Sequence, residues 1–263
     1  MGATGTIWLV GAGNMGGAML RGWIAEGMDP ARITVIDPFA KNVPQGVAVE
    51  ASLPAGGVPD VLVLAVKPQQ LGEVRDVFAA RGGLRLLVSV LAGVETATLG
   101  PAFGAVQVVR VMPNLPASIG QGVTVLFGDP AVRDEAARLM APLGQVEWID
   151  DEAQFHAVTA LSGSGPGYVF RVIDAMAQAG AALGLDPALA MRLAIGTVRG
   201  SAALAAGSAE SPAVLADRVA SPGGTTREGL NVLDADGAIM ALMARTLAAA
   251  ARRSEELAAA ARS

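Results

Sequence analysis

Hydrophobic positions divide the chain into two parts with different periodicity. In the first part, short runs rich in β-branched residues alternate with helix-like segments. The expected strands cover residues 6–10, 33–36, 61–66, 86–90, 106–111 and 123–127, with helices around 71–80 and 132–140. This alternation predicts an α/β fold with a mostly parallel, doubly wound sheet that binds ligands at the carboxyl ends of its strands.

After Asp151 the strand-like runs stop, and alanine and leucine dominate. A helical period joins Val169, Val172, Ile173, Met176, Gly180 and Leu183. Further helices are expected around residues 187–206, 212–219, 225–233 and 238–260. The chain is therefore predicted to have a Rossmann-type domain over residues 1–151 and an all-α domain over residues 152–263.

Composition adds an expectation about subunits. Hydrophobic residues make up 52% of the chain and charged residues 16%, but no apolar run is long enough to span a bilayer. Burial between subunits is the expected use of this apolar excess, so we predict a homo-oligomer with no membrane partner. The net charge of −5 and the lack of a basic run argue against nucleic acid. The N-terminus has no positive region of the signal-peptide type, which predicts a cytoplasmic protein.

The inventory of reactive side chains is small. The chain has no cysteine, which excludes thiolate nucleophiles, disulfides and iron–sulfur clusters. A single histidine, His156, without a nearby pattern of carboxylates predicts no metal site. Lys41 and Lys67 are the two lysines, so lysine chemistry is restricted to those positions.

A glycine turn follows the first expected strand directly. Gly11, Ala12, Gly13, Asn14, Met15 and Gly16 form the pattern GxGxxG between that strand and a helical stretch. In such a turn Gly11 permits the tight bend, Gly13 lets the backbone approach a pyrophosphate, and Gly16 lets the helix pack on the strand. The context of strand, turn and helix predicts a dinucleotide site.

Asp37 ends the second expected strand. A carboxylate there is placed to accept the 2′-hydroxyl of an adenine ribose and would repel a 2′-phosphate. The alternative is a turn-forming residue before Pro38.

Three segments close later strands and are candidates for a rigid wall around a ribose and a nicotinamide ring. The first contains Ala65, Val66, Lys67 and Pro68, the second residues 90–93, and the third Met112, Pro113 and Asn114. Ordinary loop punctuation explains the same residues equally well.

Two glycine-rich segments interrupt the helical part. Residues 161–168 carry three glycines and a proline, which predicts a broken or kinked helix or a plain turn between helices. In the other segment Ser221 and Pro222 precede Gly223 and Gly224, and Thr225 and Thr226 suit the start of a helix. Uncapped N–H groups at such a helix start bind a carboxylate without a cationic side chain, although a loop followed by a capped helix is the alternative.

Five segments together resemble the pyrroline-5-carboxylate reductase family. They are GAGNMG (11–16), AVKPQ (65–69), RVMPNLPA (110–117), ALSGSGPGYVF (160–170) and LADRVASPGGTTREGL (215–230), in that order over nearly the whole chain. The resemblance implies hydride transfer from NADH or NADPH to a cyclic imine, giving L-proline. It also implies a helical dimerisation domain interleaved with that of a second subunit, and dimers assembled into larger rings.

The resemblance also implies roles for individual residues. The glycine turn would hold the pyrophosphate, and residues 65–68 and 112–114 would flank the ribose and nicotinamide. Glu152 would be a further member of the cofactor site. Ser221, Gly224, Thr225 and Thr226 would bind the substrate, its carboxylate on backbone N–H groups and its ring nitrogen near the Thr226 hydroxyl, which would act as the catalytic helper.

Three positions depart from the family pattern. His156 stands where an aspartate is common, and Arg218 where asparagine or another polar residue is often found. Asp37 replaces the small or basic residues with which many relatives use NADPH, so NADH is the expected preference.

Two other functions remain open at this point. A β-hydroxyacid dehydrogenase also joins a Rossmann domain to a helical one, but its chemistry needs a lysine in the second domain, and no lysine follows Lys67. A regulatory protein that binds a dinucleotide without turnover is the other alternative, because a Rossmann domain alone indicates only binding.

Overall fold

The structure, a computed structural model, describes residues 5–66 and 71–262. Its residues form two compact units. The first, here the sheet unit, runs up to Ser164 and includes the C-terminal segment from Ala250; the second, here the helical unit, is Gly165–Ala249. Among the described residues, no helix has the length and apolarity needed to cross a bilayer.

The sheet unit contains an eight-stranded sheet with the order β3-β2-β1-β4-β5-β6-β7-β8. All described strand pairs are parallel except β6 with β7. The strands are β1 (Ile7–Val10), β2 (Ile33–Ile36), β3 (Ala48–Glu50), β4 (Val61–Leu64), β5 (Leu86–Ser89), β6 (Gln107–Met112), β7 (Gly122–Gly128) and β8 (Gly144–Trp148). The predicted α/β class with a mostly parallel sheet is confirmed, whereas β3 and β8 were not expected from the sequence.

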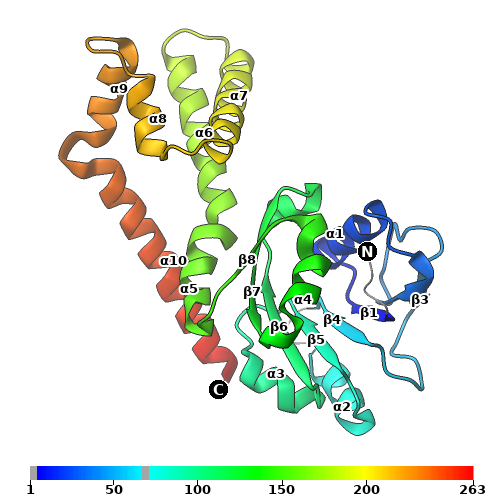
Figure 1. The fold of residues 1–263 in the computed structure, drawn as a ribbon. Coiled ribbons are helices and arrows are strands. Elements are labelled where there is room, and N and C mark those ends of the chain that lie inside the picture. The colour runs from blue at the N-terminus through cyan, green and yellow to red at the C-terminus, as the bar shows by residue number, and fades with distance from the viewer. Residues whose placement is uncertain (1–4, 67–70, 263) are drawn as a thin grey trace. The chain divides into compact units, whose positions relative to one another are not determined.

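Helices cover both faces of this sheet (Figure 1). One core contains Leu9, Val35 and Val63 and packs under α1 (Asn14–Ala25) and α4 (Arg133–Met140). The next residue along each strand points the other way, into a second core under α2 (Leu71–Arg81) and α3 (Thr96–Phe103). Because both faces are covered there, the central strands β4 and β5 are buried at every position and almost entirely apolar, as expected for a buried parallel sheet.

A broken helix follows β8. A short 3₁₀ turn, Glu152–Gln154, leads into α5 (Phe155–Val158), then into a π-helical turn, Thr159–Gly163. The Ser164 N–H donates to the Thr159 carbonyl at 2.8 Å, the five-residue step of a π-helix. The glycine-rich segment therefore interrupts the helix, as the sequence predicts.

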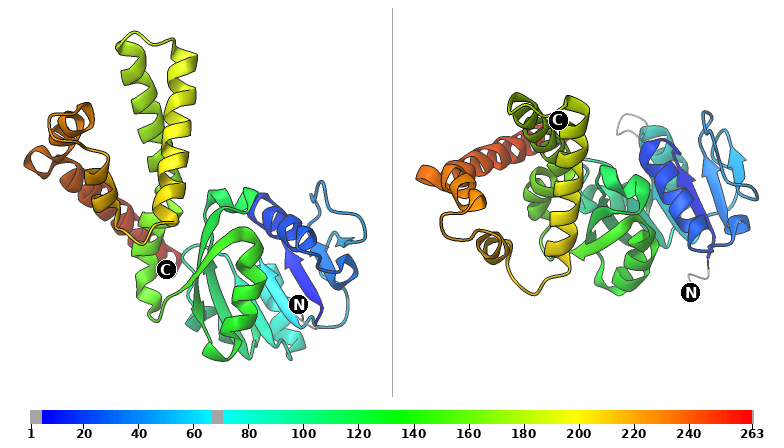
Figure 2. Two further views of the ribbon diagram at one scale, coloured as in Figure 1. Left: turned by 45° about the horizontal axis from the view of Figure 1, so that its top comes forward. Right: turned by 90° about the horizontal axis from the view of Figure 1, so that it is seen from above.

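The helical unit is built from α6 (Gly165–Ala182), α7 (Pro187–Ala206), α8 (Pro212–Arg218), α9 (Thr225–Asp234) and the first half of α10 (Ala238–Arg262). α6 and α7 form an antiparallel hairpin (Figure 2). The small side chains of Ala177, Ala190 and Ala194 are buried, whereas many large apolar side chains of this unit are exposed, among them Phe170, Leu193, Ile195 and Met240. Such an apolar surface on single helices is typical of a subunit interface.

A bidentate ion pair joins the start of β5 to α4 and gives a test of stability against pH. Arg85 donates to Glu135 at 2.6 and 2.9 Å, and this hydrogen bonding holds the pKa of Glu135 below its ordinary value of 4.5. A carboxylate with a lowered folded-state pKa stabilises the fold above the ordinary value and loses that contribution as the pH falls through the folded-state pKa. Glu135→Gln should lower the melting temperature at pH 7 by about 1 to 4 °C, since the pair is partly exposed.

The difference between Glu135→Gln and wild type should shrink as scanning calorimetry is repeated from pH 7 down to pH 3. The matched change at the exposed Glu26 should have no such dependence. A difference in melting temperature that stays constant over this range would mean that the Arg85–Glu135 pair does not stabilise the fold.

Candidate functional site

The glycine turn between β1 and α1 has the shape that its three glycines predict. Gly11 has a φ of +91°, and a Cβ there would lie 2.7 Å from the Ala65 carbonyl oxygen. A Cβ on Gly16 would overlap the Gly11 carbonyl oxygen, whereas a Cβ on Gly13 would meet nothing within 4 Å. The turn is thus closed at its first and third glycines and open at its second, where a pyrophosphate would approach.

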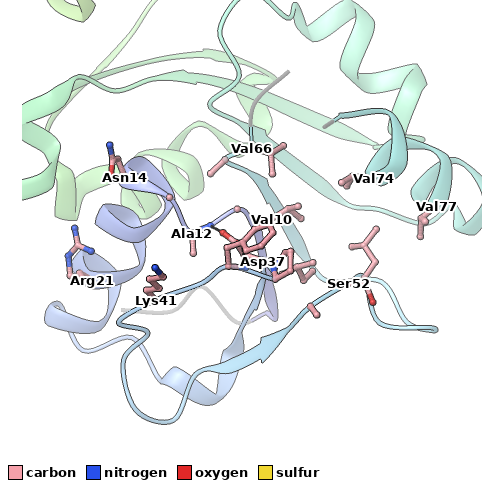
Figure 3. A pocket seen from close by; sticks show the side chains of 18 of the residues that line it. Val10, Ala12, Asn14, Arg21, Asp37, Lys41, Ser52, Val66, Val74 and Val77 are labelled. Carbon is pink, nitrogen blue, oxygen red and sulfur yellow. Dashed lines mark hydrogen bonds between the residues drawn. The ribbon is translucent and has the colours of Figure 1, made fainter. Parts of the chain in front are cut away.

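A cavity of about 1020 Å³ opens at this turn (Figure 3). Its lining comes from the ends of several parallel strands, including Gly11, Ala12, Gly13, Asn14, Asp37, Ala65 and Val66. The volume suits a ligand of dinucleotide size, and the position at the carboxyl ends of β1, β2 and β4 is where an open α/β sheet binds one.

Asp37 makes two backbone hydrogen bonds at the cavity wall. Its Oδ2 accepts from the Ala12 N–H and its Oδ1 from the Phe39 N–H, both at 2.8 Å. The bond from Ala12 attaches the Asp37 carboxylate to the glycine turn. The bond from Phe39 is the turn-forming contact expected of an aspartate before a proline, which was the alternative interpretation of Asp37. A carboxylate has lone pairs for about four hydrogen bonds, so these two leave capacity for a ribose hydroxyl.

Two cations in the cavity lining were missed by the sequence reasoning. Arg21 on α1 and Lys41 after β2 line the same cavity as Asp37 and are labelled in Figure 3. Lys41 follows Asp37 by one short turn, and Arg21 follows Gly16 in α1. This closeness in sequence to the predicted cofactor residues was the signal that could have identified both cations.

The segments that follow the later strands contribute unequally to the cavity lining. Ala65 and Val66 line the cavity, while Lys67 and Pro68 lie outside the described residues. From the loop after β6, the described lining includes Leu115 and Ser118, but not Met112, Pro113 or Asn114.

Asn114 is buried and its amide is already engaged. Its Oδ1 accepts from the Val123 N–H at 2.9 Å, and its Nδ2 donates to the Ser162 carbonyl at 3.1 Å. The side chain therefore connects β7 to the π-helical turn.

Glu152 is likewise engaged within the sheet unit. Its carboxylate accepts from the Thr96 N–H and hydroxyl and from Arg110, and it is not part of the described cavity lining.

The second glycine segment forms a turn before α9. Gly223 has a φ of +69°, the Gly224 N–H donates to the Ser221 carbonyl at 2.9 Å, and the helix begins at Thr225 as predicted. Ser221, Thr225 and Thr226 are exposed. Among described residues no side chain caps α9, whereas Asp186 and Ser211 cap α7 and α8. Its first N–H groups are thus available to an anion.

Two of the three residues that depart from the family pattern, His156 and Arg218, have side-chain partners within the protein. His156 Nδ1 lies 3.0 Å from Ser254 Oγ on α10, and Arg218 pairs with Glu210.

The strand order and the open glycine turn define a Rossmann-type dinucleotide-binding fold, here followed by a helical unit. Two sequence models match parts of the chain: "NADP oxidoreductase coenzyme F420-dependent" matches residues 6–93, and "Pyrroline-5-carboxylate reductase dimerisation" matches residues 152–257, which extend beyond the helical unit at both ends. The chain belongs to the pyrroline-5-carboxylate reductase family, because a relative of that name from Pseudomonas aeruginosa is 40% identical over 97% of this chain and 98% of its own length.

Other relatives support the same assignment. A pyrroline-5-carboxylate reductase from Arabidopsis thaliana is 36% identical over 95% of each chain. The structure of the Coxiella burnetii enzyme superposes with a TM-score of 0.88 at 35% identity, covering 97% of this chain and 98% of that one. A Plasmodium falciparum pyrroline carboxylate reductase, described with NADP bound, gives a TM-score of 0.80 at 25% identity, with coverages of 97% and 98%. The family is one of oxidoreductases that use a nicotinamide cofactor, and its dimerisation domain supports a homo-oligomer.

Proposed function

We propose that this chain reduces pyrroline-5-carboxylate to L-proline with a reduced nicotinamide dinucleotide. The observation that carries the proposal is that two helices begin after glycine turns without a capping side chain among the described residues. One is α1 after Gly13 and the other is α9 after Gly224. Each is suited to an anionic group, the first to a pyrophosphate and the second to a substrate carboxylate.

The proposed cofactor residues are those of the glycine turn, with Asp37, Ala65 and Val66 in the cavity lining. We include Lys67, Pro68, Met112, Pro113, Asn114 and Glu152 on the family resemblance, although the side chains of Asn114 and Glu152 are engaged elsewhere. The proposed substrate residues are Ser221, Gly224, Thr225 and Thr226. We also propose that the functional domains divide near Asp151, where the dimerisation match begins.

Little side-chain chemistry is required of this chain. When bound, the reduced nicotinamide supplies the hydride that the imine carbon accepts. The protonated imine is already electrophilic, so the protein mainly has to align it and exclude water. The N–H groups at the start of α9 hold the carboxylate, and the Thr226 hydroxyl orients the ring nitrogen or relays a proton through water.

The proposal is tested by following NADH absorbance on addition of pyrroline-5-carboxylate. We expect imine-dependent oxidation of NADH and none with pyruvate-type keto acids. Turnover of a hydroxy acid or keto acid instead would favour a dehydrogenase of the β-hydroxyacid type. Cofactor binding without any turnover would favour a regulatory protein.

Cofactor preference is a separate prediction that depends on Asp37. We propose that NADH is preferred, because the Asp37 carboxylate at the end of β2 would repel a 2′-phosphate. Asp37→Asn retains an acceptor for the Ala12 N–H and removes the charge, leaving Arg21 and Lys41 in the same cavity. The ratio of kcat/KM for NADPH to that for NADH should rise about tenfold or more, an energy of about 1.4 kcal/mol.

Steady-state kinetics of wild type and Asp37→Asn with both cofactors check this preference. Equal or better wild-type efficiency with NADPH would overturn it.

We further propose that the exposed apolar faces of α6 and α7 are buried in a homodimer, with larger assemblies of dimers formed from it. Light scattering after gel filtration should give an even multiple of the 26.4 kDa chain mass.

A further inference from the structure

A partly buried carboxylate, that of Glu152, holds the end of the loop after β5. Glu152 Oε2 accepts from the Thr96 hydroxyl at 2.7 Å, and Oε1 accepts from the Thr96 N–H and from Arg110 Nη1, both at 3.0 Å. The Arg110 and Glu152 side chains are only 7% and 18% exposed, and the Arg110 guanidinium lies 4.3 Å from the centre of the Phe155 ring. Because Thr96 is the first residue of α3, Glu152 supplies the cap that this helix start otherwise lacks among the described residues.

The same loop, residues 90–95, is held at other points. The Val90 N–H donates to the Leu64 carbonyl at 3.0 Å, so the loop begins attached to β4, and Leu91 is buried. Gly93 has a φ of +77°, and a Cβ there would lie 3.6 Å from Ala258 Cα in the last turns of α10, drawn in red in Figure 1. The loop is therefore held by β4 at its start and by packing against α10 at its middle, and Glu152 binds Thr96 directly after its end.

The loop lies beside the expected position of the nicotinamide. Dinucleotides bind across the point where the strand order reverses, which here lies between β1 and β4. Asp37 after β2 marks the adenosine side, so the nicotinamide half extends over the ends of β4 and β5. Ala65 and Val66 follow β4 and line the cavity, whereas residues 90–95 follow β5 and are not part of the described lining.

We propose that Glu152 is a positioning residue for hydride transfer: Arg110 holds its carboxylate, and through Thr96 that carboxylate fixes residues 90–95 as a wall at the nicotinamide end of the site. It acts without touching the cofactor. This role rests on the proposed function. It assigns Glu152 an indirect effect on the cofactor in place of the direct contact that the family resemblance implies. The proposed pyrophosphate and ribose contacts are at the glycine turn and Asp37, away from residues 90–95, so loosening the wall should disturb alignment more than affinity.

Thr96→Val is the most direct test, because it removes the hydroxyl bond and keeps the shape and the backbone N–H. In the full-length protein, kcat with NADH should fall about three- to tenfold while the KM for NADH changes less than about twofold. The isotope effect with NADH deuterated at the transferred position should increase, because hydride transfer becomes slower relative to other steps. Thr96→Ser, which keeps the hydroxyl, should stay within about twofold of wild type in every parameter.

Glu152→Gln and the double variant provide an independent measurement. Glu152→Gln should lower kcat at least as much as Thr96→Val does. Adding Thr96→Val to Glu152→Gln should lower kcat by less than a further factor of about two, because both changes act on the same Thr96–Glu152 contact. If Glu152→Gln does not fold, the comparison of Thr96→Val with Thr96→Ser still decides. The proposal is overturned if Thr96→Val leaves kcat unchanged, or if either variant raises the KM for NADH without lowering kcat. Absence of imine-dependent oxidation by the wild type would instead refute the proposed function.

Discussion

Gly16→Ala is expected to abolish NADH-dependent activity and to lower the melting temperature by about 6 to 12 °C. The new Cβ would overlap the carbonyl oxygen of Gly11, which is backbone and held in place by the Gly11 N–H bond to the Ile36 carbonyl at 3.0 Å. Relief requires α1 to move away from β1, and overpacking costs typically about 1 to 3 kcal/mol, so a clash with fixed backbone is taken at the upper end, about 3 kcal/mol. In a chain of this size each kcal/mol corresponds to about 2 to 4 °C.

Gly13→Ala is the matched control within the same turn. Its Cβ would meet nothing within 4 Å, and its φ of −66° suits alanine. The fold should therefore keep its melting temperature within about 4 °C, since alanine at a helix N-cap costs about 1 kcal/mol or less relative to glycine. The KM for NADH should nevertheless rise at least about tenfold, because the methyl group occupies the space where the pyrophosphate approaches the backbone.

Thermal melts without ligand and titration with NADH separate these two effects. The expected pattern is loss of stability at Gly16 and loss of affinity alone at Gly13. Equal affinity for NADH in Gly13→Ala and wild type would mean that the cofactor does not bind at this turn.

The features that the sequence predicted well depend on local chemistry. The bend at Gly11 and the start of α9 at Thr225 are encoded by residues adjacent to the structures they form. The buried strands are predictable for a similar reason, because a short, continuous apolar run such as 61–66, in a segment where strands alternate with helices, is typical of a strand buried on both faces. β3 and β8 lack this signal, since Ala48, Val49 and Glu50 are exposed and β8 alternates between exposed and half-buried positions.

The partners of Asn114 and Glu152 could not be predicted from the sequence. Asn114 bonds to Ser162 across 48 positions of the chain, and Glu152 to Thr96 across 56. These contacts form only after the helical segment that follows β8 returns to the sheet, and neither short motif indicates that return. The family motif predicts a ligand contact for each of these residues, and the structure adds partners within the protein for their polar atoms.

Arg21 and Lys41 illustrate the opposite case. Both carry a charge that suits a phosphate, but charged residues on a helix or in a surface turn are most often simply solvated. The cavity that they share with Asp37 distinguishes them from the other arginines within the part of the chain that the structure describes.

Thr226→Val is expected to lower kcat/KM for pyrroline-5-carboxylate about ten- to a hundred-fold. The change removes the exposed hydroxyl in the first turn of α9 and preserves its shape. A hydrogen bond to a charged group contributes about 1.5 to 3 kcal/mol, and the ring nitrogen of the protonated imine is such a group.

Thr225→Val is the neighbouring control, because its proposed contact is a backbone N–H, and it should stay within about threefold of wild type. Thr226→Ser should restore most of the activity, since it returns the hydroxyl. An unchanged rate in Thr226→Val would remove Thr226 from the mechanism and leave the backbone N–H groups at the start of α9 as the remaining proposed contacts to the substrate.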